Sequence, residues 1–510
     1  MNLLSTPRRI SVALGISRFL KMFLGLVVLY LSVKYFGTTF QRDSWVLSVG
    51  LFGIILVFLY SPINETFRTK YIFLKEKGDE KSAMKSVNSL MNLFSLSFLL
   101  VAVSLFLFKD SIAHILAPGF DTSQCDFLSW MILSLIPYYI LQQQGNILIA
   151  LLNTYDSYFY PEIISLLASV INILFIVFFS DLLGIYSLVV ATTLNGVILV
   201  SFLTFILRRK VKYFRLISFE SLSFSKPFVA FSIPMYLSTF CNQMYILVEK
   251  SSCTCFGEGA VSVFDYARQI TSLPHVVFSS IIPIVMTPLL SRCFINGDED
   301  SFSDELRRFL RLLFYFTIII AVLMQTNGEQ ISYLLFSEKN VQFVSILAYL
   351  GISIVLLVFV MICGQAMIAR ERVIDYAVSV AIGNVVSIVL CLGFVKYYSL
   401  EYIALFYLVG QALSAIILFC RMQIKRKWLM LRDVLSMVVF FIISSGLLMV
   451  LQMLLKDTIL SSQDRLYALF DLLICGVVVF FIFLCFLFLF GKEDRKALYN
   501  LLSEKIKHKK

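Results

Sequence analysis

Long apolar stretches separated by short polar ones run through the whole chain. Fourteen of them have about 17 residues or more, enough for a helix to cross a hydrocarbon core of roughly 30 Å. In lipid each must be a helix, because an isolated strand would leave backbone groups unpaired. The pattern predicts an all-α polytopic membrane protein with fourteen transmembrane helices. They are expected at 11–35, 44–60, 89–108, 127–152, 162–180, 184–207, 228–250, 261–290, 309–326, 341–369, 374–395, 400–420, 434–455 and 470–490.

The composition excludes a soluble protein with a membrane anchor. Of the 510 residues, 59% are hydrophobic and 15% are charged, whereas soluble domains carry about 25% charged residues. The longest loop is expected at 61–88, with short amphipathic pieces on the membrane surface there and near 291–308. No segment outside the spans reaches the roughly 50 residues of a stable domain. We therefore expect a protein that is not an enzyme.

Basic residues are distributed unevenly between the two sides of the predicted bundle. When Lys34, Lys250 and Arg311, which lie near the ends of spans, are counted with the adjoining side, 32 of the 43 Lys and Arg residues fall on the side of the termini, 8 on the other and 3 within spans. Basic residues are concentrated in cytoplasmic loops of membrane proteins, so both termini are expected in the cytoplasm. The net charge of +11 is thereby explained by topology and anionic lipid headgroups, and we do not expect nucleic acid as a partner. The first span follows Arg8 and Arg9 and is read as a retained helix rather than a signal peptide.

Cysteine and histidine do not form a metal-binding pattern. The ten Cys lie mostly inside or beside spans, where they act as small apolar residues. Only Cys253 and Cys255 are close in sequence, and the chain has three His in total. We expect no metal site and no cofactor.

A short internal echo predicts two lobes. Phe36-Gly37 lies between the first two spans, and Phe256-Gly257 lies between the seventh and eighth. Many transporters are built from such repeats around a site at the membrane midplane. The echo predicts two pseudo-symmetric six-helix lobes followed by two further helices. The boundaries are 1–215 for the N-terminal lobe, 216–430 for the C-terminal lobe, 431–491 for the last two helices and 492–510 for a basic cytoplasmic tail.

Ionisable residues inside spans are costly and are therefore candidate functional residues. Arg18 and Lys21 lie three apart in the first span and share one helix face. They either face a central cavity or extend to the cytoplasmic interface as anchors. In the eighth span Asp265 and Arg268 are also three apart. They form either a local ion pair or, through Arg268, part of the cavity. Asp43 starts the second span, as a helix cap or a gate residue.

Uncharged polar residues recur within the spans as well. Gln142, Gln143 and Asn146 in the fourth span and Gln269 in the eighth are candidates to line a wet cavity, although such groups commonly bond neighbouring helices together. The cations lie in the first and eighth spans, one from each predicted lobe. A positively charged cavity suits a phosphate or diphosphate headgroup, and the apolar walls suit a lipid tail.

Several motifs in order resemble those of the bacterial lipid II flippases of the MurJ/MviN type. Ala117-Pro118-Gly119-Phe120 after the third span resembles the APGF signature of this family. The segment from Leu152-Asn153 to Pro161 resembles its LN-x-P turn. Ser17-Arg18, Phe36-Gly37 with Asp43, and Phe256-Gly257 leading to Tyr266-Ala267 also match. The order and spacing hold over residues 1–290.

The resemblance implies a fold of the multidrug/oligosaccharidyl-lipid/polysaccharide exporter superfamily in the bacterial inner membrane. It implies alternating access and movement of an undecaprenyl-diphosphate-linked sugar, lipid II first among them, to the outer leaflet. Arg18 carries over as a cavity cation and Asp43 as the acid near the outer gate. The chain departs from the pattern at Leu24 and Phe58, where the family has arginines. Arg268 precedes Gln269, which aligns with a third arginine.

Other functions stay open at this point. A flippase for an O-antigen or capsule precursor would need the same chemistry. A drug or cation antiporter of the same superfamily would favour a cavity rich in acids. We expect a lipid-linked glycan substrate, contact with membrane lipids, cell-wall synthesis proteins as candidate partners, and a monomer.

Overall fold

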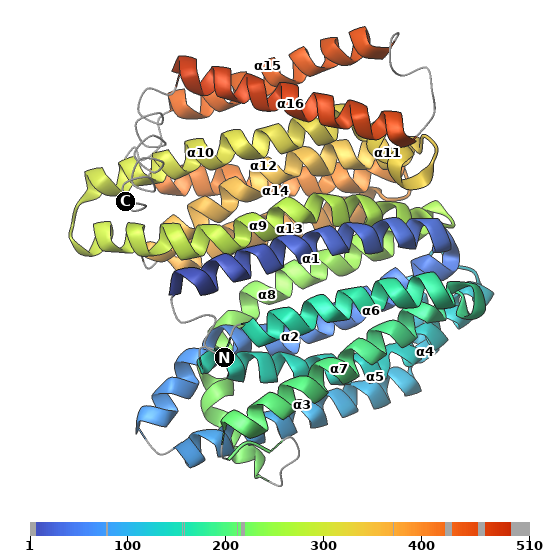
Figure 1. Ribbon diagram of the computed structural model, residues 1–510, viewed down its shortest axis with the longest axis vertical. Coiled ribbons are helices and arrows are strands. Elements are labelled where there is room, and N and C mark those ends of the chain that lie inside the picture. The colour runs from blue at the N-terminus through green and yellow to red at the C-terminus, as the bar shows by residue number, and fades with distance from the viewer. Residues whose placement is uncertain are drawn as a thin grey trace. The chain divides into compact units, whose positions relative to one another are not determined.

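The computed structural model consists of helices joined by short connections, with no strand among the residues it describes (Figure 1). The described residues are 7–77, 80–155, 157, 159–211, 213–215, 220–370, 372–423, 431–456 and 465–490. The chain divides into two compact units, Met1–Asp265 and Tyr266–Lys510. The six-plus-six arrangement of lobes with a boundary at 215/216 stays a prediction.

The first unit is a bundle centred on α2 and α5. α2 packs against α5 and α8, α5 packs against α7, α7 against α6, and α6 against α1. The elements are α1 Pro7–Phe36, α2 Phe40–Lys77, α3 Glu80–Leu107, α4 Lys109–Leu116, α5 Thr122–Thr154, α6 Phe159–Leu183, α7 Tyr186–Lys210, η1 Leu222–Ser225, α8 Lys226–Cys253 and η2 Thr254–Phe256. The helix α9, Ala260–Ile295, begins in this unit and continues into the second.

The second unit is built around α12. α12 packs against α10 and α14, α14 packs against α13, and α10 also contacts α15 and α16. The short helix α11 lies against α16. The elements are α10 Glu299–Thr326, α11 Gly328–Phe336, α12 Val341–Ala369, α13 Val373–Phe394, α14 Glu401–Gln423, α15 Leu431–Lys456 and α16 Arg465–Phe490.

Nine of the described helices are long and apolar enough to cross a membrane: the relevant parts of α2, α3, α5, α6, α7, α10, α12, α13 and α14. Shorter apolar helices occur at 438–450 and 467–482. Each of the fourteen predicted stretches falls on a helix, so the chain is an all-helical polytopic membrane protein. Large apolar side chains face outward on α6, where Leu182 is 79% exposed, as expected when lipid replaces water as the solvent. The number of fourteen crossings stays a prediction.

The structure corrects the loop expected at 61–88. α2 continues without a break to Lys77, and α3 starts at Glu80. Ile63, Phe67 and Tyr71 recur every four residues and therefore lie on one helix face. All three are buried, and the ring of Phe67 stacks on Phe228 at 5.1 Å. Charged residues between them made the segment look like a loop, but the apolar stripe packs it into the bundle instead of leaving it on the surface.

Candidate functional site

Two Phe-Gly turns place the starts of α2 and α9. Gly37 ends α1 with φ 57°, and Gly257 follows η2 with φ 96°. Both values lie in the left-handed region, which glycine adopts without a Cβ penalty. In each case the next helix begins three residues later, at Phe40 and at Ala260. The sequence echo therefore corresponds, at both places, to a glycine with positive φ shortly before a helix start.

Asp43 joins these two helix starts. Its Oδ2 accepts a hydrogen bond from Gly259 N at 2.7 Å, and its Oδ1 accepts from Ser262 N at 2.7 Å and from Ser262 Oγ at 2.5 Å. The side chain is fully buried. The first amides of a helix have no partner within the helix and favour a negative charge. Asp43 thus caps the N-terminus of α9 from another helix.

A second contact runs in the opposite direction. Phe40 N at the start of α2 donates to Glu258 Oε1 at 3.1 Å, so each helix start receives a carboxylate from the other segment. A Cβ at Gly259, whose φ is 82°, would lie 2.6 Å from Thr38 O. The backbones of the two turns are therefore in close contact, which only glycine permits at this position.

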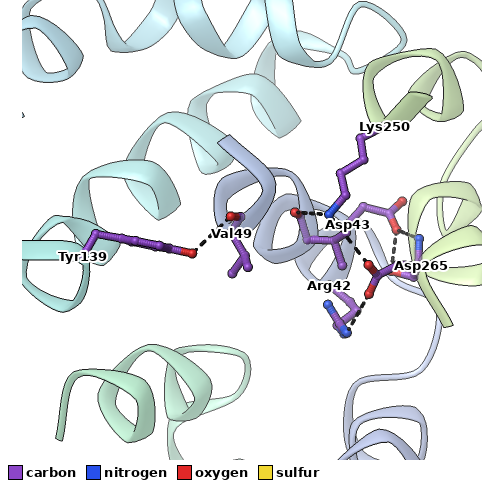
Figure 2. Close-up of polar contacts among 8 residues, drawn as sticks. Arg42, Asp43, Val49, Tyr139, Lys250 and Asp265 are labelled. Carbon is purple, nitrogen blue, oxygen red and sulfur yellow. Dashed lines mark hydrogen bonds and ion pairs between the residues drawn. The ribbon is translucent and has the colours of Figure 1, made fainter. Parts of the chain in front are cut away.

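Beside Asp43, three charged residues from three helices form a cluster, shown in Figure 2. Asp265 Oδ2 of α9 lies 3.4 Å from Arg42 Nη2 of α2, and Asp265 Oδ1 lies 3.7 Å from Lys250 Nζ of α8. The side chain of Arg42 is only 4% exposed. Buried charges are tolerated when they are paired, and here one acid serves two cations.

Lys250 reaches its partner by lying across α2. Its Nζ donates to Val46 O at 3.4 Å. A Cβ at Gly50 would lie 2.8 Å from Lys250 Cδ, so the missing side chain at Gly50 makes room for the lysine stem. The long apolar stem covers the helix while the ammonium group reaches the carboxylate.

With Asp43 included, the four charges of this cluster sum to zero. We call Arg42, Asp43, Lys250 and Asp265 the four-charge cluster. A balanced cluster of this kind holds α2, α8 and the start of α9 together and does not present an excess of positive charge to an anion.

The APGF loop packs against the segment that leads into the four-charge cluster. Gly119 N donates to Thr254 Oγ1 at 3.2 Å, and a Cβ at Gly119 would lie 2.0 Å from Thr254 O. Ser251 Oγ also donates to Ile115 O at 3.3 Å. The glycine of this motif is required because the backbone of η2 occupies the space of a side chain. The loop fixes the position of η2, three residues before Gly259.

The predicted polar residues of α5 form no hydrogen bond with the four-charge cluster among the described residues, and two of them have hydrogen bonds of their own. Gln142 Nε2 donates to Asn146 Oδ1 at 3.4 Å, and Tyr60 Oη donates to Asn146 O at 2.7 Å. Gln143 is fully buried, and neither polar atom of its side chain has a partner among the described residues. One turn earlier, Tyr139 Oη donates to Val49 O at 3.1 Å (Figure 2).

The cations predicted to line the cavity lie on α1 and α9. Arg18 lies in α1, but its side chain is outside the described residues, and Lys21 is exposed on the same helix. Arg268 of α9 lies over the ring of Tyr407 in α14, with Cζ 4.2 Å from the ring centre. Gln269 is half-buried, and its carbonyl accepts from Ser272 Oγ at 2.7 Å. The roles of these residues stay predictions.

The structure thus brings Asp43 and Asp265 into one cluster. The sequence did not predict Arg42 and Lys250 as its other members. The three-residue spacing predicts an ion pair of Asp265 with Arg268 as one alternative, and the structure gives Asp265 the partners Arg42 and Lys250. Both cations lie at the ends of predicted spans, where basic residues usually extend to the interface. The one available signal was Gly50, whose small size in an apolar helix allows another side chain to cross it.

Comparison with known proteins decides the family. The profile described as lipid II flippase MurJ matches residues 32–468. The chain belongs to the lipid II flippase MurJ family. This is a family of transporters and not of enzymes, which confirms the expectation drawn from the motifs.

Individual MurJ relatives are distant. The probable lipid II flippase MurJ of Buchnera aphidicola subsp. Schizaphis graminum is 20% identical over 342 residues, 66% of each chain. The lipid II flippase MurJ of Burkholderia cenocepacia is 24% identical over 272 residues, 49% of this chain and 50% of that one. The chain thus aligns with two thirds or less of the length of these relatives.

Solved structures show the same fold at low identity. A lipid II flippase MurJ in an inward closed conformation has a TM-score of 0.74 at 17% identity and covers 93% of this chain and 97% of its own. An inward-facing multidrug resistance MATE family transporter of the MOP superfamily has a TM-score of 0.68 at 18% identity, with 79% and 94% covered. The chain therefore has the MurJ/MATE fold.

Proposed function

We propose that this protein moves an undecaprenyl-diphosphate-linked sugar precursor, most specifically lipid II, from the inner to the outer leaflet of the bacterial inner membrane. The observation that carries the proposal is the match of the MurJ profile over residues 32–468. The relatives that are named lipid II flippases are distant, so the cargo is the part of the proposal that most needs a test.

Alternating access requires a closure that can open on one side at a time. We assign this closure to the four-charge cluster and to the hydrogen bonds of Asp43 with Gly259 and Ser262. Hydrogen bonds to a charged group contribute about 1.5–3 kcal/mol each. Three such bonds can keep the closure shut. The binding free energy of a large substrate can offset their loss.

The diphosphate is assigned to the cations outside this cluster: Arg18, Lys21 and Arg268. Diphosphate oxygens bind arginine through two parallel hydrogen bonds. The stacking of Arg268 on Tyr407 supports this assignment, because a guanidinium held by its face directs its N–H groups sideways. Gln142, Gln143, Asn146 and Gln269 are proposed to serve the polar part of the cargo.

The same proposal includes the orientation of the protein in the membrane and its neighbours. The proposal includes cytoplasmic termini, which the charge distribution supports, and the start of α2 with Asp43 then lies toward the outer surface. The protein is proposed to act as a monomer, with cell-wall synthesis proteins as neighbours.

The test is rescue of a bacterium in which the native lipid II flippase is depleted. Wild-type protein should restore growth and prevent lipid II from accumulating in the inner leaflet. Asp43→Ala should abolish rescue, while Asp126→Ala, which changes an exposed aspartate of α5, should rescue normally. All variants are compared at equal amounts in the membrane.

The cargo and the cations are tested in the same strain. Arg18→Ala should weaken binding of undecaprenyl diphosphate by about ten-fold or more, since one charge-assisted contact contributes about 1.5–3 kcal/mol, and Arg18→Lys should lose less. Failure of the wild-type protein to rescue, with another lipid-linked glycan accumulating when the protein is depleted from its own host, would assign it a different cargo. Full activity of Arg18→Ala would make Arg18 an anchor at the interface.

A further inference from the structure

The C-terminal end of α7 carries an excess of positive charge. The helix ends with Arg208, Arg209 and Lys210, and all three are exposed. Lys212 and Arg215 follow, and the sequence contains no acid between positions 208 and 219. The C-terminus of a helix carries roughly half a negative charge, which favours cations there. Three full charges exceed what this dipole balances, so the end of α7 stays positive.

No acid is paired with the three cations at the end of α7 in the described part of the chain. Other cations lie beside acids, as Arg421 does beside Asp375 at 2.9 Å. The acid in the first turn of the neighbouring α6 is Glu162, and Asp156 lies outside the described residues. Even with both of these acids counted, the three cations leave a net positive charge.

Neutral groups hold two of the cations in position. Lys210 Nζ donates to Ser157 Oγ at 2.6 Å and lies 4.9 Å from the ring centre of Tyr160. Arg209 Cζ lies 4.1 Å from the ring centre of Phe205. Such contacts restrict the side chains but leave their charges in place. A side chain that is already held loses less conformational freedom when an anion binds.

An apolar stripe begins beside these charges. Leu194, Val197 and Phe205 recur at helix spacing on the same face of α7 as Arg208, and they are between 36% and 53% exposed. α6 packs along the side of α7 (Figure 1). From Arg208 to Val197 the stripe covers about 16 Å of helix, close to half of the roughly 30 Å hydrocarbon core. A cationic end above such a stripe matches a phospholipid, which joins an anionic headgroup to chains that fill one leaflet.

We propose that the end of α7 is a binding site for an anionic phospholipid, with phosphatidylglycerol as the type of ligand. Arg208 and Arg209 donate to the phosphate oxygens, for which guanidinium groups provide paired N–H donors. Lys210 adds a third charge from the side of α6. The chains lie along the apolar stripe of α7.

The combination of charge and apolar surface selects this ligand. Free phosphate would use the cations but leave the stripe without a role. A zwitterionic phospholipid brings a cation of its own next to its phosphate, which the excess of positive charge disfavours. The site therefore distinguishes anionic from zwitterionic phospholipids.

This proposal goes beyond the proposed function and does not rest on it. It concerns the contact of α6 and α7 of the first unit with membrane lipid, and not the cations assigned to the diphosphate of the cargo. A bound phospholipid adds to the contact of Lys210 with Ser157 and should therefore stabilise the joined ends of the two helices.

Native mass spectrometry of the purified protein in detergent measures the affinity for the first bound phospholipid. Wild-type protein should bind phosphatidylglycerol at least about ten-fold more tightly than phosphatidylcholine. Changing both arginines, Arg208→Gln with Arg209→Gln, should weaken binding of phosphatidylglycerol by about thirty-fold, because each basic residue near an anionic lipid contributes to binding. Arg208→Lys with Arg209→Lys should retain most of the affinity, because the charges stay.

A second pair of consecutive arginines provides the matched control. Arg307 and Arg308 lie beside Asp304 and Glu305 at 3.5 and 3.8 Å. Arg307→Gln with Arg308→Gln should bind phosphatidylglycerol as wild-type protein does. Glycerophosphate, which has a phosphate charge but no chains, should not displace the lipid at equal concentration.

The comparison of the two phospholipids uses wild-type protein and therefore holds even if a variant does not fold. Equal affinity for both phospholipids, unchanged binding in Arg208→Gln with Arg209→Gln, or displacement by glycerophosphate would each overturn the proposed site. An equal loss in the control variant would assign the effect to net charge and would overturn it as well. Rescue of a flippase-depleted strain does not enter these measurements, so failure here is distinguishable from failure of the proposed function.

Discussion

Two regions of this protein contain aspartates with little exposed surface and surround them in opposite ways. In the first unit, Asp43 accepts three hydrogen bonds and Asp265 is paired with Arg42 and Lys250. In the second unit, Asp471 meets an amide and a thiol. In the first arrangement, donors and cations surround the acids. In the second, neither of the two partners is a cation.

The difference shows what each region can respond to. A charged cluster that joins three helices is broken by anything that competes for its cations or separates the helices. The pair of Asp471 and Gln330 contains no cation, so it is insensitive to such competition. Substitutions that change charge without changing shape should therefore have large effects in the first region and small effects in the second.

The largest effect is expected for Asp265→Asn. This change leaves Arg42 and Lys250 close together without their shared acid. Removing one partner of a buried ion pair typically costs 3–5 kcal/mol, so we expect a fall of about 3–5 kcal/mol in the free energy of unfolding. Thermal unfolding of purified protein in detergent, compared with Asp126→Asn, measures the difference.

A second substitution separates lost charge balance from lost shape. Adding Lys250→Met to Asp265→Asn removes the surplus cation and should restore about half of the loss. If the double variant is as unstable as Asp265→Asn alone, the pairing of Lys250 with Asp265 does not matter for stability.

Ser262→Ala should have a smaller effect. It removes the hydroxyl donor at 2.5 Å from Asp43 Oδ1 but keeps both backbone donors. We expect a loss of about 1.5–3 kcal/mol, the usual size for one hydrogen bond to a charged group. Ser262→Thr keeps the hydroxyl and serves as the control. Equal unfolding temperatures for Ser262→Ala and wild-type protein would mean that the two backbone amides suffice.

The effect of Gly50→Ala on stability should change sign with the residue at position 250. In wild-type protein the new Cβ meets Lys250 Cδ at 2.8 Å and displaces the lysine from Val46 O, which should destabilise by about 0.5–1 kcal/mol. With Lys250→Met, whose shorter flexible side chain can yield, alanine should instead stabilise the helix by about 0.5–1 kcal/mol. Unfolding of the four variants measures this coupling. The same sign in both backgrounds would contradict the contact between Lys250 and Gly50.

The sequence predicted the helices well because lipid leaves few alternatives. Each predicted apolar stretch falls on a helix, and the family motifs led to the correct family. The extension of α2 to Lys77 was missed because its charges hid the stripe of Ile63, Phe67 and Tyr71. That stripe is visible at a spacing of four, but only packing against α8 shows that it is buried.

The site was less predictable, because its partners come from distant parts of the chain. Asp43 is separated from Ser262 by 219 positions and Arg42 from Asp265 by 223. Local spacing can show that Asp265 and Arg268 share a helix face, but not that Lys250 crosses α2 at Gly50. Asp471 lies within a predicted span. Its contact with Gln330 could not be predicted, because Gln330 lies on the short helix α11, which was not predicted.

The smallest effect is expected for Asp471→Asn. Because asparagine is neutral and offers both a donor and an acceptor to Gln330, it can keep the contact with this amide. We expect a change below about 1 kcal/mol in the free energy of unfolding. Asp471→Leu should lose about 1–3 kcal/mol, because it leaves the polar atoms of Gln330 buried without partners. Thermal unfolding of the two variants and wild-type protein compares them directly. A loss as large as that of Asp265→Asn would show that the charge of Asp471 is needed, and the contrast between the two regions would then disappear.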